Sequence, residues 1–401
     1  MDFDLTDPER AFQEAVRRFG DTVLRPQERR IDTEGRIPDE VLREMAHLGL
    51  LSMMVPPEYG GMGASAVLTE IAAEEIGRGD LSMATAVFFL LEAGWGRTLA
   101  LHGTEAARHE ILPAVCRGES FLGIATTEPT GGSDLAGMRT ESHREGSEFV
   151  LHGEKAFLSG VEEARSRGGG HLTLTRSRGT AGGFNFLYVP TGHPSLATQR
   201  FANMGRMGIS TGAITYDHAR VPERYLLGEE GRGFGIALEG FTVARTFVSA
   251  ACVGAAERAL EIGTAYLRER RAFGQPLGKF EGIQFELADL YAQIEAVKWQ
   301  CRRAAWLIDQ RFGPDARPDA AARSELERVV AAVKLTAPPV AFETIKRVMM
   351  WFGAAGYTRE VGLERGFRGI MSYMVGAEGG LNIMRIILGR ELLGKEFVPY
   401  K

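Results

Sequence analysis

The residues best suited to ligand chemistry form a glycine-rich turn, ATTEPTGGSD, at positions 125–134. Its proline fixes one backbone dihedral, and Gly131 and Gly132 let the backbone come close to a bound group. Ser133 and Asp134 can cap such a turn with their side-chain oxygens. An ordinary glycine turn has the same ingredients, so the ligand must be argued from the rest of the chain.

Three further segments bring together aromatic, hydroxyl, guanidinium and carboxylate groups: EKAFLSG at 154–160, ERRAFGQPL at 269–277 and AEGGLNIMR at 377–385. In the first, Phe157 offers an aromatic face and Ser159 a hydroxyl donor. In the second, Arg270 is suited to bidentate binding of a phosphate. In the third, Glu378 is a loop carboxylate flanked by small residues, a position that is usually solvent-facing unless it serves a site.

Other common sites are not indicated. His47, His102 and His109 are spread through segments of helical pattern, and no pair has metal-ligand spacing, so no metal is expected. No GxGxxG follows a strand in a βαβ unit, which argues against a Rossmann nicotinamide site. The cysteines form no CxxC pair, so we expect buried reduced thiols at three positions: Cys116, Cys252 and Cys301.

Composition excludes some broad classes of protein. The 401 residues are 44% hydrophobic and 25% charged, an ordinary globular balance. The net charge of −5 argues against a nucleic-acid partner. The N-terminus is acidic and lacks a basic-then-apolar signal pattern, and no run of 18 apolar residues is present. We therefore expect a cytoplasmic protein that does not enter a membrane.

The elements that must position the four segments change type twice along the chain. Residues 1–119 have the hydrophobic period of helices, starting with Asp7 as the predicted N-cap and Pro8 as the first helical residue. Residues 229–401 are helical again, with long amphipathic patterns at about 236–271, 281–312 and 318–352. These boundaries predict an N-terminal helical domain and a C-terminal helical bundle.

Residues 120–228 between them change to the strand period and predict a small antiparallel β domain. Glycines, prolines and charged turns separate four short strand candidates, at 149–151, 171–175, 186–189 and 213–216. The run RSRGGG at 165–170 is expected to be a flexible turn.

The order of helices, strands and helices, together with the four segments, resembles the acyl-CoA dehydrogenase family from Asp4 to about Gly394. The turn at 125–134 matches all fixed positions of the family pattern TEPxxGSD. The segment at 269–277 is similar to ERxxFGxPI, and the tail IILGRELLG at 386–394 matches an apolar stretch that ends in RxLLG. The resemblance implies an α+β fold with an N-terminal helical domain, a central antiparallel β-barrel domain and a C-terminal four-helix bundle.

The resemblance also implies FAD as cofactor and an acyl thioester as substrate. Arg270 would meet the FAD pyrophosphate across a subunit interface, so the protein would be a homo-oligomer, a dimer or more often in the family a tetramer. The implied FAD contacts are Thr126, Thr127, Gly132, Ser133, Phe157, Ser159, Arg270, Phe273, Gly353 and Gly380. The implied substrate contacts are Ser133, Arg245, Ala377 and Gly379.

The same frame places Glu378 at the position of the catalytic base. Some family members carry that glutamate on an earlier helix, just before an arginine, but the corresponding pair here is Ala244-Arg245. An α-proton beside a thioester is weakly acidic, so the carboxylate needs an apolar site that raises its pKa toward ~6–7. Donors must also face the oxygen of the forming enolate. In the family these are the glutamate backbone N–H and a ribityl hydroxyl of FAD, and the flavin accepts the β-hydride.

Several positions depart from the family pattern. Ala377 replaces a tyrosine beside the base, which favours a branched, carboxylated or otherwise functionalised acyl group, carried on coenzyme A or an acyl carrier protein. Other changes affect expected FAD contacts, and each is expected to weaken FAD binding by about 1 kcal/mol. They are Met207 for Arg, Glu281 for Gln, Met350 for Gln, Gly369 for Asp and Gly380 for Thr.

Three hypotheses about function follow from these observations. The first is α,β-dehydrogenation of an acyl thioester, with electrons leaving to an electron-transfer flavoprotein or a similar acceptor. The second keeps the fold and changes the reaction to flavin-dependent oxygenation or oxidative decarboxylation. Glu378 argues against simple oxygenation, because flavin monooxygenases of this fold generally lack it. The third is a flavin-free scaffold that binds a thioester or a protein.

Overall fold

Helices form the first part of the chain in the computed structural model, which describes residues 4–313 and 319–399. They are α1 (Asp7–Phe19), α2 (Arg25–Glu34), α3 (Asp39–His47), α4 (Ala66–Gly79), α5 (Ala84–His102) and α6 (Glu105–Cys116). The N-cap of α1 is Thr6 rather than the predicted Asp7. The Thr6 hydroxyl accepts from Glu9 N, and the Glu9 carboxylate accepts from Thr6 N at 2.8 Å, a reciprocal capping box. Because Thr6 occupies the N-cap position, Asp7 becomes the first helical residue.

The middle of the chain forms one seven-stranded sheet. Six strands follow the order β1-β4-β2-β3-β7-β6, and the seventh, β5, lies outside this order and pairs with β4. The strands are β1 (Phe121–Ala125), β2 (Glu141–Glu145), β3 (Glu148–Ser159), β4 (Gly169–Ser177), β5 (Phe184–Pro190), β6 (Leu196–Arg200) and β7 (Thr211–Pro222). All four predicted strands are present. The pairs β1–β4 and β2–β4 are parallel, so the sheet is mixed where an antiparallel one was predicted.

The predicted flexible turn at 165–170 is largely ordered secondary structure. Helix α7 (Val161–Ser166) occupies its first part, and β4 begins at Gly169. An added Cβ on Gly169 would lie 2.1 Å from Phe121 O, so this glycine permits the close β1–β4 approach. The glycines were therefore signals of close packing rather than of flexibility.

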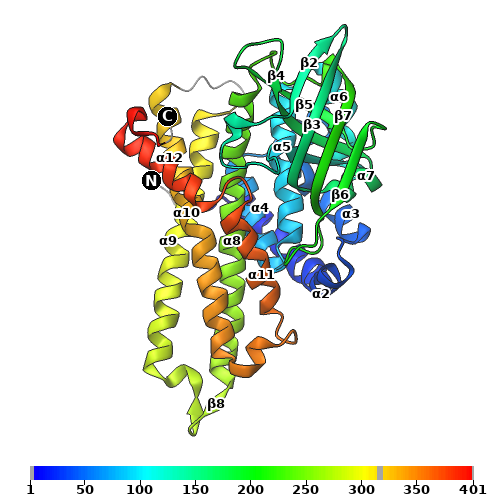
Figure 1. The fold of residues 1–401 in the computed structure, drawn as a ribbon. Coiled ribbons are helices and arrows are strands. Elements are labelled where there is room, and N and C mark those ends of the chain that lie inside the picture. Colours follow the sequence, from blue (N-terminus) through cyan, green and yellow to red (C-terminus); the bar gives the residue numbers. More distant parts are fainter. Residues whose placement is uncertain (1–3, 314–318, 400–401) are drawn as a thin grey trace.

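The C-terminal part is a bundle of helices: α8 (Gly233–Glu269), α9 (Glu281–Arg311), α10 (Ala320–Trp351), α11 (Leu363–Val375) and α12 (Leu381–Leu393). Helix α8 packs against α4 and α5 on one side and against α9 and α10 on the other (Figure 1). It is long and apolar enough to span a membrane by composition, but 78% of its most apolar window is buried inside the protein. That burial is typical of the central helix of a core. The three cysteines are buried and free, as predicted.

Candidate active site

Glu378 lies in the loop 376–380, between α11 and α12. Three consecutive residues of this loop have left-handed backbone angles, with φ of +45° at Ala377, +64° at Glu378 and +104° at Gly379. A non-glycine residue in this region costs roughly 1–3 kcal/mol, so the surrounding structure must hold the loop in place. Such strain is typical of functional sites.

Arg245 of α8 is the first of the groups that hold the loop. Its Nε donates to the backbone carbonyl of Glu378 at 2.7 Å, and its side chain is buried against the ring of Phe241. Burial lowers the pKa of Arg245 to about 10, so it stays charged at neutral pH. Ala244, the position of the alternative base in the family, is fully buried beside it. The residue after the alternative base position thus contacts the loop of Glu378, and of the two base positions only Glu378 offers a carboxylate.

Burial raises the pKa of Glu378 to about 7. The charge of Arg245 opposes this rise most strongly among the neighbouring groups. The buried indole N–H of Trp95 also favours the charged carboxylate, although it makes no hydrogen bond of normal geometry within the described structure. A carboxyl that titrates near neutrality can accept a proton from a weak carbon acid and release it again.

Lys334 of α10 is a second cation beneath the loop. Its side chain is fully buried, and its ammonium donates to Tyr373 O and, at 3.4 Å, to Gly379 O. Among the described residues no carboxylate lies within ion-pair distance of it. Burial lowers the pKa of Lys334 to about 8, and Glu378 partly offsets that effect. The ammonium therefore ties α11 to the loop through two carbonyl groups.

The glycine-rich turn at 125–134 is fixed to β3 by a buried ion pair. Lys155 is fully buried and donates to Thr126 O at 2.9 Å and to Glu128 Oε1 at 3.0 Å. Glu128 also accepts from the backbone N–H groups of residues 139 and 140, each at 2.8 Å. Burial alone would raise the pKa of Glu128, but these donors hold it below its ordinary value. Thr127 O accepts from residue 156 of β3, so the first two segments lie side by side.

The end of β3 presents Phe157 and Ser159. A register shift between residues 156 and 158 makes Phe157 the extra residue of a β-bulge, with φ of +60° and 64% of its surface exposed. Ser159 O accepts from Nε2 of the buried His171, at 3.0 Å. Burial lowers the pKa of His171 to about 4, so the imidazole is neutral. It fixes the backbone at the predicted hydroxyl donor.

Three further predicted cofactor contacts lie at the end of the C-terminal bundle that is far from the sheet (Figure 1): Arg270, Phe273 and Gly353. Arg270 caps α8, and Phe273 is 95% exposed in the turn between β8 (Arg271–Ala272) and β9 (Gln275–Pro276). Gly353 follows α10, whose end meets α8 where the Phe352 and Tyr266 rings stack at 3.9 Å. Figure 1 shows β8 at the far tip of the bundle, away from the sheet and α12. One chain therefore does not bring these residues to the other predicted contacts.

The residues present fit a large planar cofactor with phosphates. Phe157 and Phe273 are large aromatic rings held exposed by left-handed backbone. A Cβ added to Gly131 or Gly353 would meet nothing within 4 Å, so the backbone is open to a ligand at both places. The exposed Arg270 supplies a guanidinium for phosphate.

Two of the departures from the family pattern have local packing reasons. A Cβ on Gly369 would lie 2.5 Å from Ser82 O, so an aspartate cannot enter without displacing backbone. A Cβ on Gly380 would lie 3.0 Å from Val375 O, which leaves no room for threonine without adjustment. Glu281 is the first residue of α9, where a carboxylate favours the helix N-terminus.

Sequence reasoning missed Trp95, His171 and Lys334. A lysine within the apolar run VVAAVKLTA was a signal that could have been followed, because an isolated cation in such a run must find a partner. Trp95 and His171 sit in apolar segments that look like ordinary core. Their partners come from other elements of the fold, so no local pattern points to them.

Comparisons with known proteins agree along the whole chain. Family models described as the N-terminal, middle and C-terminal domains of acyl-CoA dehydrogenase match residues 6–119, 123–219 and 231–393. A probable acyl-CoA dehydrogenase of Bacillus subtilis is 32% identical, covering 98% of this chain and 100% of that protein. An isobutyryl-CoA dehydrogenase of Dictyostelium discoideum is 29% identical, over 97% of this chain and 90% of its own length. A glutaryl-CoA dehydrogenase structure superposes with a TM-score of 0.90 and 28% identity, covering 100% and 99% of the two chains.

Proposed function

The chain belongs to the acyl-CoA dehydrogenase family, an FAD-dependent oxidoreductase group acting on CH–CH bonds, and we propose that Glu378 is its catalytic base. Glu378 would remove the proton α to the carbonyl of an acyl thioester. Bound FAD supplies the acceptor for the β-hydride. The observation that carries the proposal is a carboxyl of pKa about 7 on a strained loop between two buried cations.

The loop also offers a donor for the substrate oxygen. Within the described part of the chain, the backbone N–H of Glu378 donates to no protein acceptor. The Glu378 carbonyl, which belongs to the next peptide unit, is held by Arg245, and this contact restrains the loop directly after the donor. A thioester oxygen that accepts from this N–H would place its α-carbon near the carboxylate and stabilise the enolate as charge develops.

Two groups of residues would hold FAD. The first, near β3, comprises Thr126, Thr127, Gly132, Ser133, Phe157 and Ser159, and Gly380 lies beside the base. The second is Arg270, Phe273 and Gly353 at the far tip of the bundle. The separation of the two groups in one chain supports a homo-oligomer, a dimer or tetramer, in which the tip of one copy reaches the cofactor of another (Figure 1). The exposed Arg270 would then bind the pyrophosphate.

The acyl group is proposed to be branched, carboxylated or otherwise functionalised. Ala377 places only a methyl group beside Glu378, which leaves space near the acyl chain. Two of the similar proteins are named for isobutyryl-CoA and glutaryl-CoA, a branched and a carboxylated substrate. The proposed carrier is coenzyme A or an acyl carrier protein. The variant Ala377→Tyr should harm the true substrate more than butyryl-CoA, and equal losses on both would contradict the proposal.

The acceptor is proposed to be an electron-transfer flavoprotein, and a solved structure from work on the electron transferring flavoprotein of Acidaminococcus fermentans, similar to this chain at 26% identity, supports this. The test of the function is the absorbance spectrum of the purified protein, recorded anaerobically before and after addition of acyl-CoA and acyl-carrier thioesters. Bleaching of the flavin band by one thioester is expected. A flavin band that no thioester bleaches would instead favour oxygenation or oxidative decarboxylation, and the absence of flavin uptake would favour a binding scaffold.

A further inference from the structure

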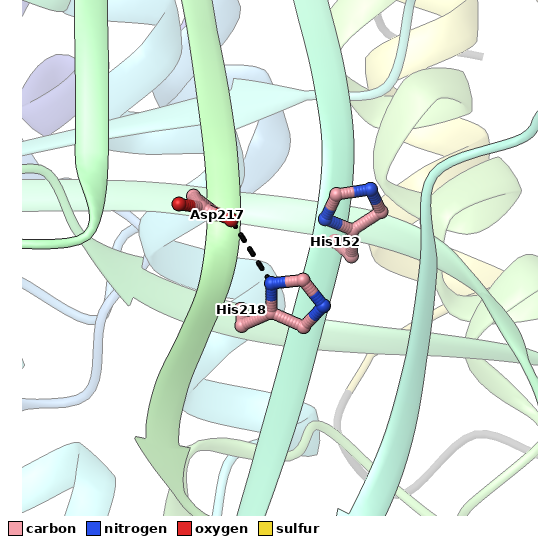
Figure 2. A group of neighbouring side chains, drawn as sticks. All are labelled: His152, Asp217 and His218. Atoms are coloured by element: carbon pink, nitrogen blue, oxygen red, sulfur yellow. Dashed lines mark hydrogen bonds and ion pairs between the residues drawn. The ribbon is translucent and has the colours of Figure 1, made fainter.

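A cluster of two imidazoles and a carboxylate lies on the solvent-exposed side of β3 and β7, where no catalytic role has been assigned. It consists of His152, Asp217 and His218, and one nitrogen or oxygen atom of each lies within 4.8 Å of the others (Figure 2). The His152 and His218 rings are 4.6 Å apart between centroids, with 30° between their planes. His218 Nδ1 and Asp217 Oδ1 are 2.9 Å apart.

A β-bulge creates this cluster. Leu151 pairs with Ala219 and Gly153 pairs with Tyr216, so His152 alone faces two residues of β7. The extra residue puts the adjacent side chains of Asp217 and His218 on the same exposed side, which regular strand alternation forbids. His218 has φ of +52°, a conformation that non-glycine residues adopt at a cost. The backbone, not chance side-chain rotation, therefore brings the three groups together.

We propose that His152 and His218 bind a divalent transition-metal ion such as Zn²⁺, Ni²⁺ or Cu²⁺. Two imidazoles bound side by side to one tetrahedral ion hold their ring centroids roughly 5 Å apart, close to the spacing seen here. The Asp217 carboxylate accepts from Nδ1–H of His218, which leaves Nε2 with a free lone pair for the metal. Asp217 is thus a positioning residue, and water completes the coordination.

The residues around the cluster determine the metal affinity that we expect of the site. Glu141 of β2 is the register partner of His152, but its carboxylate is paired with Arg178 at 2.5 Å. With two imidazole ligands and water, the site should have moderate affinity and should prefer ions that favour nitrogen over Mg²⁺ and Ca²⁺. A bound ion would cross-link β3 and β7 and stabilise the sheet that ends in Phe157 and Ser159.

The test is metal binding by the tag-free, chelator-treated holoenzyme, measured by zinc titration calorimetry and by electron paramagnetic resonance with Cu²⁺. We expect one equivalent of Zn²⁺, a Cu²⁺ spectrum with nitrogen ligands, and a rise in Tm that EDTA reverses. His152→Ala and His218→Gln should each weaken binding at least about tenfold, and Asp217→Asn by roughly tenfold. The flavin content of each variant reports that it is folded.

His109→Ala is the matched control. Its imidazole is exposed and lies 2.8 Å from the Glu105 carboxylate, but the described structure places no second imidazole beside it. This variant should bind Zn²⁺ like the parent. The proposal is overturned if the parent binds no Zn²⁺ at millimolar concentration, or if His152→Ala and His218→Gln bind as tightly as His109→Ala.

Discussion

Arg245 Nε donates to the backbone carbonyl of Glu378 at 2.7 Å, so the cation that holds the loop is also the strongest charge acting on the base. The contact has two consequences, one for the position of the loop and one for the pKa of Glu378. It holds the strained 376–380 loop in place, and it keeps the pKa of Glu378 from rising further. The residue that corresponds to the alternative base, Ala244, lies beside this contact and contributes no carboxylate.

The first prediction concerns Glu378 itself. With its pKa at about 7, the rate of flavin reduction by an acyl thioester should rise as the pH passes through about 7, because only the carboxylate accepts the proton. Glu378→Gln should lower that rate by roughly 10²–10⁴ and retain flavin. Anaerobic stopped-flow absorbance between pH 5.5 and 8.5 measures both. A variant that reduces flavin at the parental rate would exclude Glu378 as the base.

The same carboxyl should influence stability. Its folded pKa is raised, so its favourable contribution is complete below the unfolded value near 4.5 and is lost as the pH rises through about 7. Glu378→Gln should therefore gain stability relative to the parent between pH 5 and 8. Urea unfolding at several pH values gives this difference, and a pH-independent difference would argue against the raised pKa.

Arg245→Gln tests the contact with the loop. Removing the cation should raise the pKa of Glu378 further and shift the pH profile of flavin reduction to higher pH. Loss of the carbonyl contact should also slow the reaction by roughly tenfold or more, since a misplaced base loses orientation. Arg385→Gln is the control, because that side chain is exposed on α12 and contacts Asn382 at 2.7 Å. An unchanged pH profile in Arg245→Gln would contradict the electrostatic role.

Lys334→Met tests the second cation. The substitution keeps the volume of the side chain and removes the charge that lowers the pKa of Glu378. We expect a shift of the pH profile to higher pH in the same direction as for Arg245→Gln, and a looser 376–380 loop as Gly379 O and Tyr373 O lose their donor. Hydrogen exchange of the loop distinguishes this from a purely structural effect elsewhere. A shift to lower pH would contradict the assignment.

The contrast between these two cations shows what the sequence could predict. The apolar tail after the loop fixes the register of the family pattern and so predicts Glu378, and the pair Ala244-Arg245, which matches the alternative base position, predicts Arg245. Lys334 was not predicted, because helical periodicity marks positions on a helix and does not show which distant carbonyl a buried ammonium meets. The exposed His152–Asp217–His218 cluster, where no metal was predicted, depends on a β-bulge. This bulge is set by pairing between residues of β3 and β7 that are more than sixty positions apart in the sequence.

The same limit explains the error about the sheet. Strand positions follow from alternating hydrophobic residues, and all four predicted strands are present. Whether two strands run parallel depends on the path of the chain between them. Residues 160–168 turn the chain through α7 and let β4 lie parallel to β1, a connection that was read as a flexible turn.

The ion pair beneath the glycine-rich turn should matter for stability. Lys155→Met leaves the Glu128 carboxylate buried without its cation, which should cost about 3–5 kcal/mol of unfolding free energy. The double variant Lys155→Met/Glu128→Gln should recover part of this loss, because no uncompensated charge remains. Urea unfolding of the single and double variants gives the comparison. A double variant that is as unstable as Lys155→Met would show that lost packing, not the unpaired charge, is responsible.

The last prediction concerns Gly369, which replaces the aspartate of the family pattern. It tests whether packing requires the glycine or whether the glycine is a lost cofactor contact. If Gly369 were simply a lost aspartate, Gly369→Asp would be harmless or would tighten FAD binding. The added Cβ instead lies 2.5 Å from Ser82 O, a backbone atom that cannot swing away, so the variant should lose roughly 1–3 kcal/mol of stability. Gly389→Asp on α12 is the control, since a Cβ there meets nothing within 4 Å. A Gly369→Asp protein with parental Tm and tighter FAD binding would mean that α11 can move away from the turn at 80–83 and that the glycine is a loss of a cofactor contact.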